Sequence, residues 1–181
     1  MVNNPYQKGS DDVFENAGGV APTSAAASQG SSSRRPSLKA RAIGYLSRRE
    51  HSRQELARKL APHANPDNPN ELEELLNELE KGNWLSNERF AQSLVNRRAP
   101  GKGTAAVMHE LRQHGLNPGQ LASIQQELAN TELERAKAVW EKKFGVPPAS
   151  AKDKAKQIRF MASRGFSASV LGKILGDLND F

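Results

Sequence analysis

Apolar residues recur every three or four positions along most of the chain, beginning near Leu38. This spacing is typical of amphipathic helices, in which one face is buried and the other is solvated. Three such stripes occupy the first part of the chain: Leu38, Ala42, Tyr45 and Leu46; Leu56 and Leu60; and Leu72, Leu75, Leu76 and Leu79. The pattern therefore predicts three helices before Gly82.

The same three-part pattern then occurs twice more. The second set of stripes is Phe90, Leu94 and Val95; Val107, Met108 and Leu111; and Leu121, Ile124 and Leu128. The third set is Leu133, Ala136, Trp140 and Phe144; Ala155, Ile158 and Met161; and Val170, Leu171, Ile174, Leu175 and Leu178. No stretch shows the alternating pattern of strands. We therefore predict an all-α fold of three tandem three-helix repeats, spanning 38–84, 85–130 and 131–181, in an elongated, curved helical array.

Capping signals place several helix ends. Ser52 to Glu55, Asn117 to Gln120 and Thr131 to Glu134 all have the spacing of a capping box, in which the first side chain and the third helical residue each accept a backbone N–H. The box at Thr131 predicts that the first helix of the third repeat begins there. Asn70 is predicted to cap the helix that follows it.

The stretch from Lys81 to Ala91 joins the first two repeats. Gly82 is predicted to end a helix in the left-handed conformation, and Phe90 opens the next apolar stripe. Trp84 and Leu85 lie between helices, so we predict that Trp84 is buried as a plug between two repeats. The alternative is that Trp84 closes the core of its own repeat. We expect Gly82, Trp84, Leu85 and Phe90 to form a structural junction.

Residues 1–37 are rich in Ser, Ala, Gly and Asn and have no sustained apolar period. Such a segment cannot bury enough apolar surface to offset the entropy of ordering it. We predict a disordered tail.

Composition narrows the classes of function. The chain has no Cys, which excludes disulfides and thiolate chemistry and fits a reducing, cytoplasmic compartment. No window is apolar enough for a membrane span. The net charge is +6, and residues 131–181 contribute 10 basic and 6 acidic side chains. This balance permits contact with nucleic acid or an acidic protein.

Two motifs resemble catalytic or ligand-binding sites only in part. His109 and His114 are five residues apart, which turns them away from each other on a helix and argues against a zinc pair. Pro100 to Thr104 resembles a phosphate loop, but it follows a helix and has Gly103 where the motif needs Ser or Thr. A flexible basic turn is the favoured interpretation, although such a turn can still hold a phosphate. We predict no catalytic residues, no metal and no cofactor.

Basic residues recur near the same turn of each repeat. The candidate partner-binding or DNA-binding residues are Arg48, Arg49 and Arg53; Arg97, Arg98 and Lys102; and Lys152, Lys154, Lys156 and Arg159. Either these side chains form a functional basic stripe, or they offset helix dipoles and favour solubility.

Two blocks together resemble a known family. Leu46-Ser47-Arg48-Arg49-Glu50-His51-Ser52-Arg53-Gln54-Glu55-Leu56 and Gly82-Asn83-Trp84-Leu85-Ser86-Asn87-Glu88-Arg89-Phe90-Ala91 look like the RecX regulators of the bacterial RecA recombinase. Gly101 to Leu116 resembles the family's next block, and the likeness covers about residues 38–180. The family often has Tyr or Phe at the position of Trp84 and acidic residues at Ser86 and Asn87.

The resemblance implies a non-enzymatic monomer that binds the RecA–DNA filament. It implies inhibition of filament growth and of the ATPase, strand-exchange and co-protease activities of RecA, and so a role in recombination, DNA repair and the SOS response. It also leaves contact with single- or double-stranded DNA open. The competing hypotheses are a DNA-binding protein with helix-turn-helix-like repeats and a scaffold for another protein.

Overall fold

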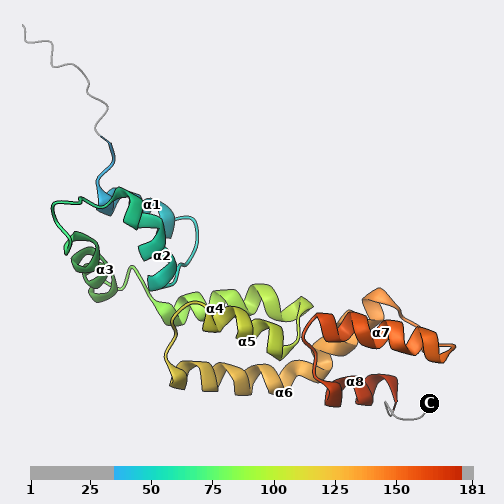
Figure 1. Ribbon diagram of the computed structural model, residues 1–181. Helices are drawn as coiled ribbons and strands as arrows, with labels where there is room; N and C mark the ends of the chain where they lie inside the picture. Colours follow the sequence, from blue (N-terminus) through green and yellow to red (C-terminus); the bar gives the residue numbers. More distant parts are fainter. Residues whose placement is uncertain (1–34, 177–181) are drawn as a thin grey trace, which may run out of the picture. The chain divides into compact units, whose positions relative to one another are not determined.

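The computed structural model describes residues 35–176, and this part of the chain is helical without strands (Figure 1). The helices are α1 (Leu38–Leu46), α2 (Arg53–Leu60), α3 (Glu71–Lys81), α4 (Asn87–Arg98), α5 (Thr104–Arg112), α6 (Pro118–Lys143), α7 (Ala151–Ser163) and α8 (Ala168–Leu175). Short 3-10 turns, Ala61–His63 and Ala99–Gly101, follow α2 and α4. The all-α prediction is confirmed. Most of the predicted tail, together with Leu178, lies outside the described residues.

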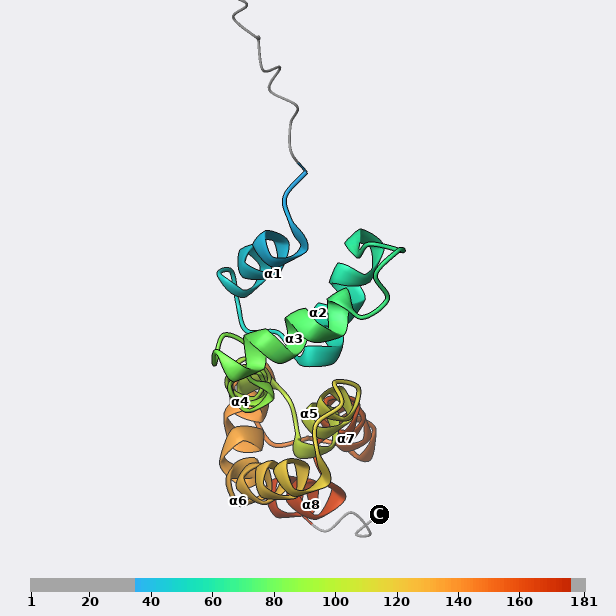
Figure 2. The same cartoon turned by 90° about the vertical axis from the view of Figure 1, so that its left-hand side faces the viewer.

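Three separate hydrophobic cores hold the helices together. The first core contains side chains of α1, α2 and α3, together with Leu85. The second core contains side chains of α4, α5 and the N-terminal part of α6. The third core contains side chains of α7, α8 and the C-terminal part of α6. Leu56, Leu60, Val107, Leu111 and Met161 are fully buried in them. Both views show α8 against α6 (Figures 1 and 2). Within residues 35–176 no helix is long and apolar enough to cross a membrane.

Helix α6 is one continuous helix of 26 residues, so the prediction of a new helix start at Thr131 is wrong. The Thr131 hydroxyl does not cap; it donates to the carbonyl oxygen of Glu127 at 3.3 Å. The sequence between Gly119 and Gly145 contains no Gly or Pro that would end a helix. Leu128 packs in the second core and Ala136 in the third, so a single rigid element serves two cores. The division at residue 131 therefore falls inside a helix.

The predicted burial of Trp84 is also wrong: its side chain is 61% exposed, while Leu85 beside it is 2% exposed. The reason lies in how α3 ends. Gly82 has an ordinary φ of −78°, and Asn83 takes the left-handed position with φ of 58°. The Asn83 and Trp84 amides donate to the carbonyl oxygens of Glu80 and Leu79, at 2.9 and 2.8 Å. This pair of bonds is a Schellman motif, in which Asn replaces the more usual Gly, and it turns Leu85 rather than Trp84 into the core.

The other predicted caps meet different outcomes. Asn117 and Gln120 form the complete capping box that opens α6. Ser52 caps α2 by accepting the Glu55 amide at 3.1 Å, but the Glu55 carboxylate points elsewhere. The predicted Asn70 cap makes no side-chain hydrogen bond to α3. The spacing of the residues therefore predicts the Ser52 and Asn117 caps but not the absence of a cap bond at Asn70.

A close backbone contact joins the N-terminus of α5 to the turn between α7 and α8. The Gly103 amide donates to the Arg164 carbonyl oxygen at 2.9 Å, and a Cβ at Gly103 would lie 2.1 Å from the Gly165 carbonyl oxygen. Only glycine fits such a contact. Gly165 itself has φ of +83° and lies against Ala106, so both glycines are required.

Two charged side chains of α6, the buried Glu132 and the partly buried Arg135, reinforce this junction. The Glu132 carboxylate accepts the Thr104 and Ser167 amides, each at 3.2 Å, and so neutralises the N-terminal ends of both α5 and α8. One turn later, the Arg135 guanidinium donates to the carbonyl oxygens of Ala99 and Leu128, at 2.9 and 2.7 Å. Burial lowers the pKa of Arg135 and the nearby Glu132 carboxylate opposes this shift.

An equivalent junction joins the N-terminus of α2 to the turn between α5 and α6. The Ser52 hydroxyl shares a hydrogen bond with His114 Nδ1 at 3.1 Å, and Asn87 Oδ1 accepts the Arg53 amide at 2.9 Å. The His114 ring also packs on Phe90, with 4.6 Å between ring centroids. In both junctions, the start of a repeat's second helix contacts the turn that follows the second helix of the next repeat.

Candidate interaction surface

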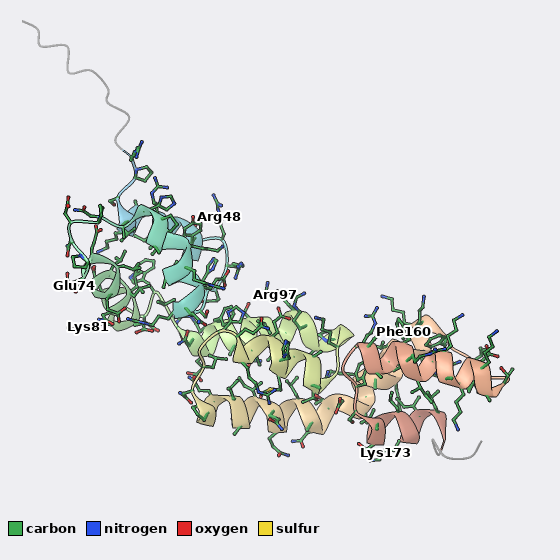
Figure 3. The ribbon with its side chains drawn as sticks, viewed as in Figure 1. Arg48, Glu74, Lys81, Arg97, Phe160 and Lys173 are labelled. Atoms are coloured by element: carbon green, nitrogen blue, oxygen red, sulfur yellow. The ribbon has the colours of Figure 1, made fainter. Side chains whose placement is uncertain are left out.

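The structure divides the ten candidate basic residues into three groups. Five are exposed and make no ion pair within residues 35–176; we call them the exposed cation set: Arg48, Arg97, Lys152, Lys156 and Arg159. Arg48 lies in the turn after α1 and Arg97 in the last turn of α4, and both side chains reach into solvent (Figure 3). Lys152, Lys156 and Arg159 lie on α7.

Four of the remaining candidates are held by carboxylates of the same chain. Arg49 forms a two-pronged ion pair with Glu55. Arg53 pairs with Glu73 and Glu80 of α3 and donates to Asn77 Oδ1. Arg98 and Lys102 both contact Glu110, at 2.9 and 3.8 Å. These ion pairs make the four side chains less available for binding to another molecule.

Lys154 differs from its neighbours on α7 because it is only 7% exposed. It lies three residues before Gln157 and seven before Met161, on the buried side of the helix. The structure therefore does not bring Lys154 to the surface beside Lys152 and Lys156.

A buried polar group lies next to the junction between α2 and the α5–α6 turn, and it includes His51 and Glu55, which are 2% and 9% exposed. Burial opposes ionisation of Glu55, but the hydrogen bonds from Arg49 and the charges around it prevail and lower its pKa to about 2. Burial lowers the pKa of His51 and of His114, and the Glu55 carboxylate opposes both shifts. Both rings are thus held in the neutral form near pH 7.

The residues of the partial zinc motif (His109 and His114) and of the partial phosphate loop (100–104) make contacts within the protein. His109 is exposed and contacts Gln113, whereas His114 contacts Ser52 at the start of α2, so the two rings do not converge. Residues 35–176 contain no group of three His, Cys, Asp or Glu side chains that could hold a metal ion. At the basic turn, the Gly103 and Thr104 amides already donate to Arg164 and Glu132. Those two amides are therefore not available to a phosphate.

A surface feature that the sequence did not reveal lies beside the exposed Trp84. A groove runs between α1 and the end of α3, and its lining includes Ile43, Leu79 and Trp84. Ile43 is itself 39% exposed, and the large apolar side chains exposed in the described part of the chain are Ile43, Trp84 and Val146. The sequence signal was the Trp itself, because a large aromatic residue in a connector is either buried or available to a partner.

Comparisons with known proteins bear on this surface. Residues 39–64 match a family model described as the first three-helix domain of RecX, and residues 130–175 match a model of the third three-helix domain of RecX. The second match begins inside α6, which is shared between two cores.

Two curated relatives are named regulatory protein RecX. The protein from Ralstonia nicotianae is 57% identical over 139 residues, covering 77% of this chain and 86% of the relative. The protein from Ralstonia pickettii is 54% identical over 144 residues, covering 80% of this chain and 89% of the relative.

Solved structures agree on the fold. The crystal structure of RecX from Lactobacillus salivarius has a TM-score of 0.62 at 19% identity and covers 76% of this chain and 91% of that one. A second crystal structure of a regulatory protein RecX has a TM-score of 0.59 at 21% identity, over 76% of this chain and 72% of that one. With all-α repeats, family models that match two of them and relatives above 50% identity, the chain belongs to the RecX family of regulatory proteins.

Proposed function

We propose that this protein binds the filament that RecA forms on DNA and inhibits RecA, limiting the growth of the filament and its ATPase, strand-exchange and co-protease activities. The observation that carries the proposal is membership of the RecX family, supported by relatives that are more than half identical over most of the chain. The protein acts without catalysis, as a monomer in the cytoplasm, and its effect depends on where it binds.

The exposed cation set gives the proposal a physical basis. A filament of protein and DNA carries many negative charges. A cation that has no carboxylate partner within its own chain does not have to break an ion pair when it binds such a charge. The paired cations Arg49, Arg53, Arg98 and Lys102 would first have to exchange an existing carboxylate partner. We therefore assign the filament contact to the exposed cation set and retain the four paired residues as its neighbours.

Charge reversal tests this assignment. The double variant Arg97→Glu with Lys156→Glu removes one member of the set from α4 and one from α7. The matched control is Lys137→Glu with Lys173→Glu, which makes the same change in net charge at two exposed lysines outside the set. The experiment measures binding of each protein to preformed RecA filaments on single-stranded DNA, at two salt concentrations.

We expect the Arg97 and Lys156 variant to bind at least about ten-fold more weakly, the control to lose about two-fold or less, and salt to weaken the wild type. Equal losses in both variants would show that net charge alone is responsible. Binding to DNA with the same affinity in the absence of RecA would favour the alternative function, a DNA-binding protein with helix-turn-helix-like repeats.

A further inference from the structure

The connector between α3 and α4 presents Trp84 in a fixed position. The Arg89 guanidinium donates to Asn83 Oδ1 at 2.8 Å and to the carbonyl oxygens of Asn83 and Trp84 at 3.0 and 3.2 Å. Its Nε donates to Glu50 at 2.8 Å, which anchors the same guanidinium to the turn before α2. Together with the Schellman bonds, these contacts hold the backbone on both sides of the indole. An exposed side chain on such a support loses little conformational entropy when a partner covers it.

The indole lies against the end of α3 because residue 82 has no side chain. A Cβ at Gly82 would lie 2.9 Å from Trp84 Cδ1 and 3.2 Å from the Glu78 carbonyl oxygen. Since Gly82 has an ordinary negative φ, the backbone conformation does not demand glycine there. The absence of a Cβ instead makes room for Trp84.

The groove beside the indole combines apolar walls with charge. Leu79 is buried at 2% exposure, while Ile43 and Trp84 are both exposed. Lys39 of α1 pairs with Glu78 of α3 at 2.5 Å, and both also line the groove. Lys81 is a further lining residue, and it is exposed with no ion pair among residues 35–176 (Figure 3). The groove therefore offers an apolar pocket with one cation available at its edge.

The charges around the groove favour a protein over a nucleic acid. Helix α3 carries Glu71, Glu73, Glu74, Glu78 and Glu80 against Lys81. Lys39 and Arg53 offset part of this charge through ion pairs with Glu78, Glu73 and Glu80. The helix and these two cations together still carry an excess of carboxylates, which would repel a phosphate backbone that followed the helix. A single carboxylate beside an apolar side chain would instead meet Lys81 and avoid the rest of the helix.

We propose that this groove is a protein-docking site in which Trp84 and Ile43 pack against an apolar side chain of the partner. Lys81 then forms an ion pair with a carboxylate of the partner next to that side chain. The proposal rests on the proposed function, because the partner that we assign to the groove is a RecA subunit of the filament. Trp is one of the residue types, with Tyr and Arg, that are enriched among those that dominate binding energy at interfaces. The Trp84 groove and the exposed cation set then contact the filament through different chemistry.

The test uses full-length variants and preformed RecA filaments on single-stranded DNA. Trp84→Ala removes the indole, Trp84→Phe keeps an aromatic ring, and Gly82→Ala leaves Trp84 in the sequence but displaces it. Lys81→Glu reverses the available charge. The control is Val146→Ala, which truncates another exposed apolar side chain, 64% exposed, in the connector after α6. Thermal melting of every variant checks that folding is unchanged, as expected for exposed positions.

Trp84→Ala is expected to raise the dissociation constant by about ten-fold or more, with smaller increases for Trp84→Phe, Gly82→Ala and Lys81→Glu and none for Val146→Ala. Wild-type affinity in a folded Trp84→Ala variant would overturn the docking site and leave the proposed function intact. A wild type that binds no filament would overturn the proposed function and this inference with it. The binding of each variant to single-stranded DNA without RecA is a further outcome. If Trp84→Ala lost this binding, the groove would hold bases, which also contradicts the proposal.

Discussion

At the scale of single residues, the buried group around His51, Glu55 and His114 makes stability depend on pH. Both histidines have a pKa below the ordinary value of 6.5 because burial disfavours their charged form. Below about pH 6.5 the unfolded chain therefore binds more protons than the folded chain, and the free energy of unfolding falls as pH falls. Each histidine contributes at most about 1.4 kcal/mol per pH unit.

We predict that chemical denaturation between pH 7.5 and about 5 shows this loss of stability, and that His51→Gln with His114→Gln reduces the slope. The control is His63→Gln with His109→Gln, because both of those rings are exposed. A second loss should follow between about pH 4.5 and 2, since the pKa of Glu55 falls from 4.5 to about 2 on folding. An unchanged slope in the buried-histidine variant would contradict the assigned protonation states.

Gly103 offers a second test at this scale. A methyl group there would overlap the Gly165 carbonyl group, so Gly103→Ala should lower the free energy of unfolding by roughly 2–4 kcal/mol. The control is the same substitution at Gly44, in the interior of α1 with no atom within 4 Å of the added Cβ. Gly44→Ala should raise stability by roughly 0.5–1 kcal/mol. Denaturant titration measures both, and a Gly103→Ala variant as stable as the wild type would show that the two turns can separate at little cost.

At the scale of elements, α6 connects two hydrophobic cores and supplies the Glu132 carboxylate that neutralises the starts of α5 and α8. Glu132→Ala would leave the Thr104 and Ser167 amides without their charged acceptor and would remove the negative charge near the partly buried Arg135. We expect a loss of roughly 3–5 kcal/mol, because each of the two lost hydrogen bonds to a charged group contributes roughly 1.5–3 kcal/mol. The control is Glu134→Ala, an exposed residue of the same helix, with an expected change of less than about 0.5 kcal/mol. Similar losses in thermal or denaturant unfolding of the two variants would contradict this role of Glu132.

The sequence predicted the elements well where short-range spacing decides them. The apolar stripes of α3 and α5 and the capping box at Asn117 depend on residues three or four apart, and all three are found in the structure. The false helix start at Thr131 arose because the same local spelling can occur in the middle of a helix. Tertiary contacts favour a continuous helix at this point. The neighbouring Glu132 is buried and accepts hydrogen bonds from the starts of α5 and α8, which requires a helical backbone at residue 132 that holds the carboxylate between them.

The candidate surface was less predictable because it depends on contacts between residues far apart in the sequence. Arg53 pairs with Glu80, 27 positions away, and that pairing sets it apart from Arg48. Trp84 was expected in the core because large aromatic residues usually pack there, but its orientation is decided by the left-handed Asn83 and by the space at Gly82. A sequence pattern shows neither which cation has an internal partner nor which of two adjacent apolar residues turns inward.

At the scale of the whole molecule, our proposal is that the chain gains binding strength by making several contacts with the filament at once. Each exposed cation contributes little alone, roughly 0–1 kcal/mol, and members on different helices should add nearly independently. The contact that we propose at the Trp84 groove would be apolar, and salt would not screen it. We therefore expect inhibition of RecA to weaken gradually as members of the exposed cation set are reversed, with no single cation of the set decisive.

If this protein regulates RecA, as we propose, its effect should be visible in the DNA-dependent ATPase of RecA. The measurement follows ATP hydrolysis by RecA on single-stranded DNA as this protein is added at substoichiometric amounts, beside the Arg97→Glu, Lys156→Glu variant and its Lys137→Glu, Lys173→Glu control. We predict that the wild type and the control suppress hydrolysis, and that the variant needs several-fold more protein for the same effect. ATP hydrolysis that is unchanged by the wild type at any ratio would show that this protein does not inhibit RecA.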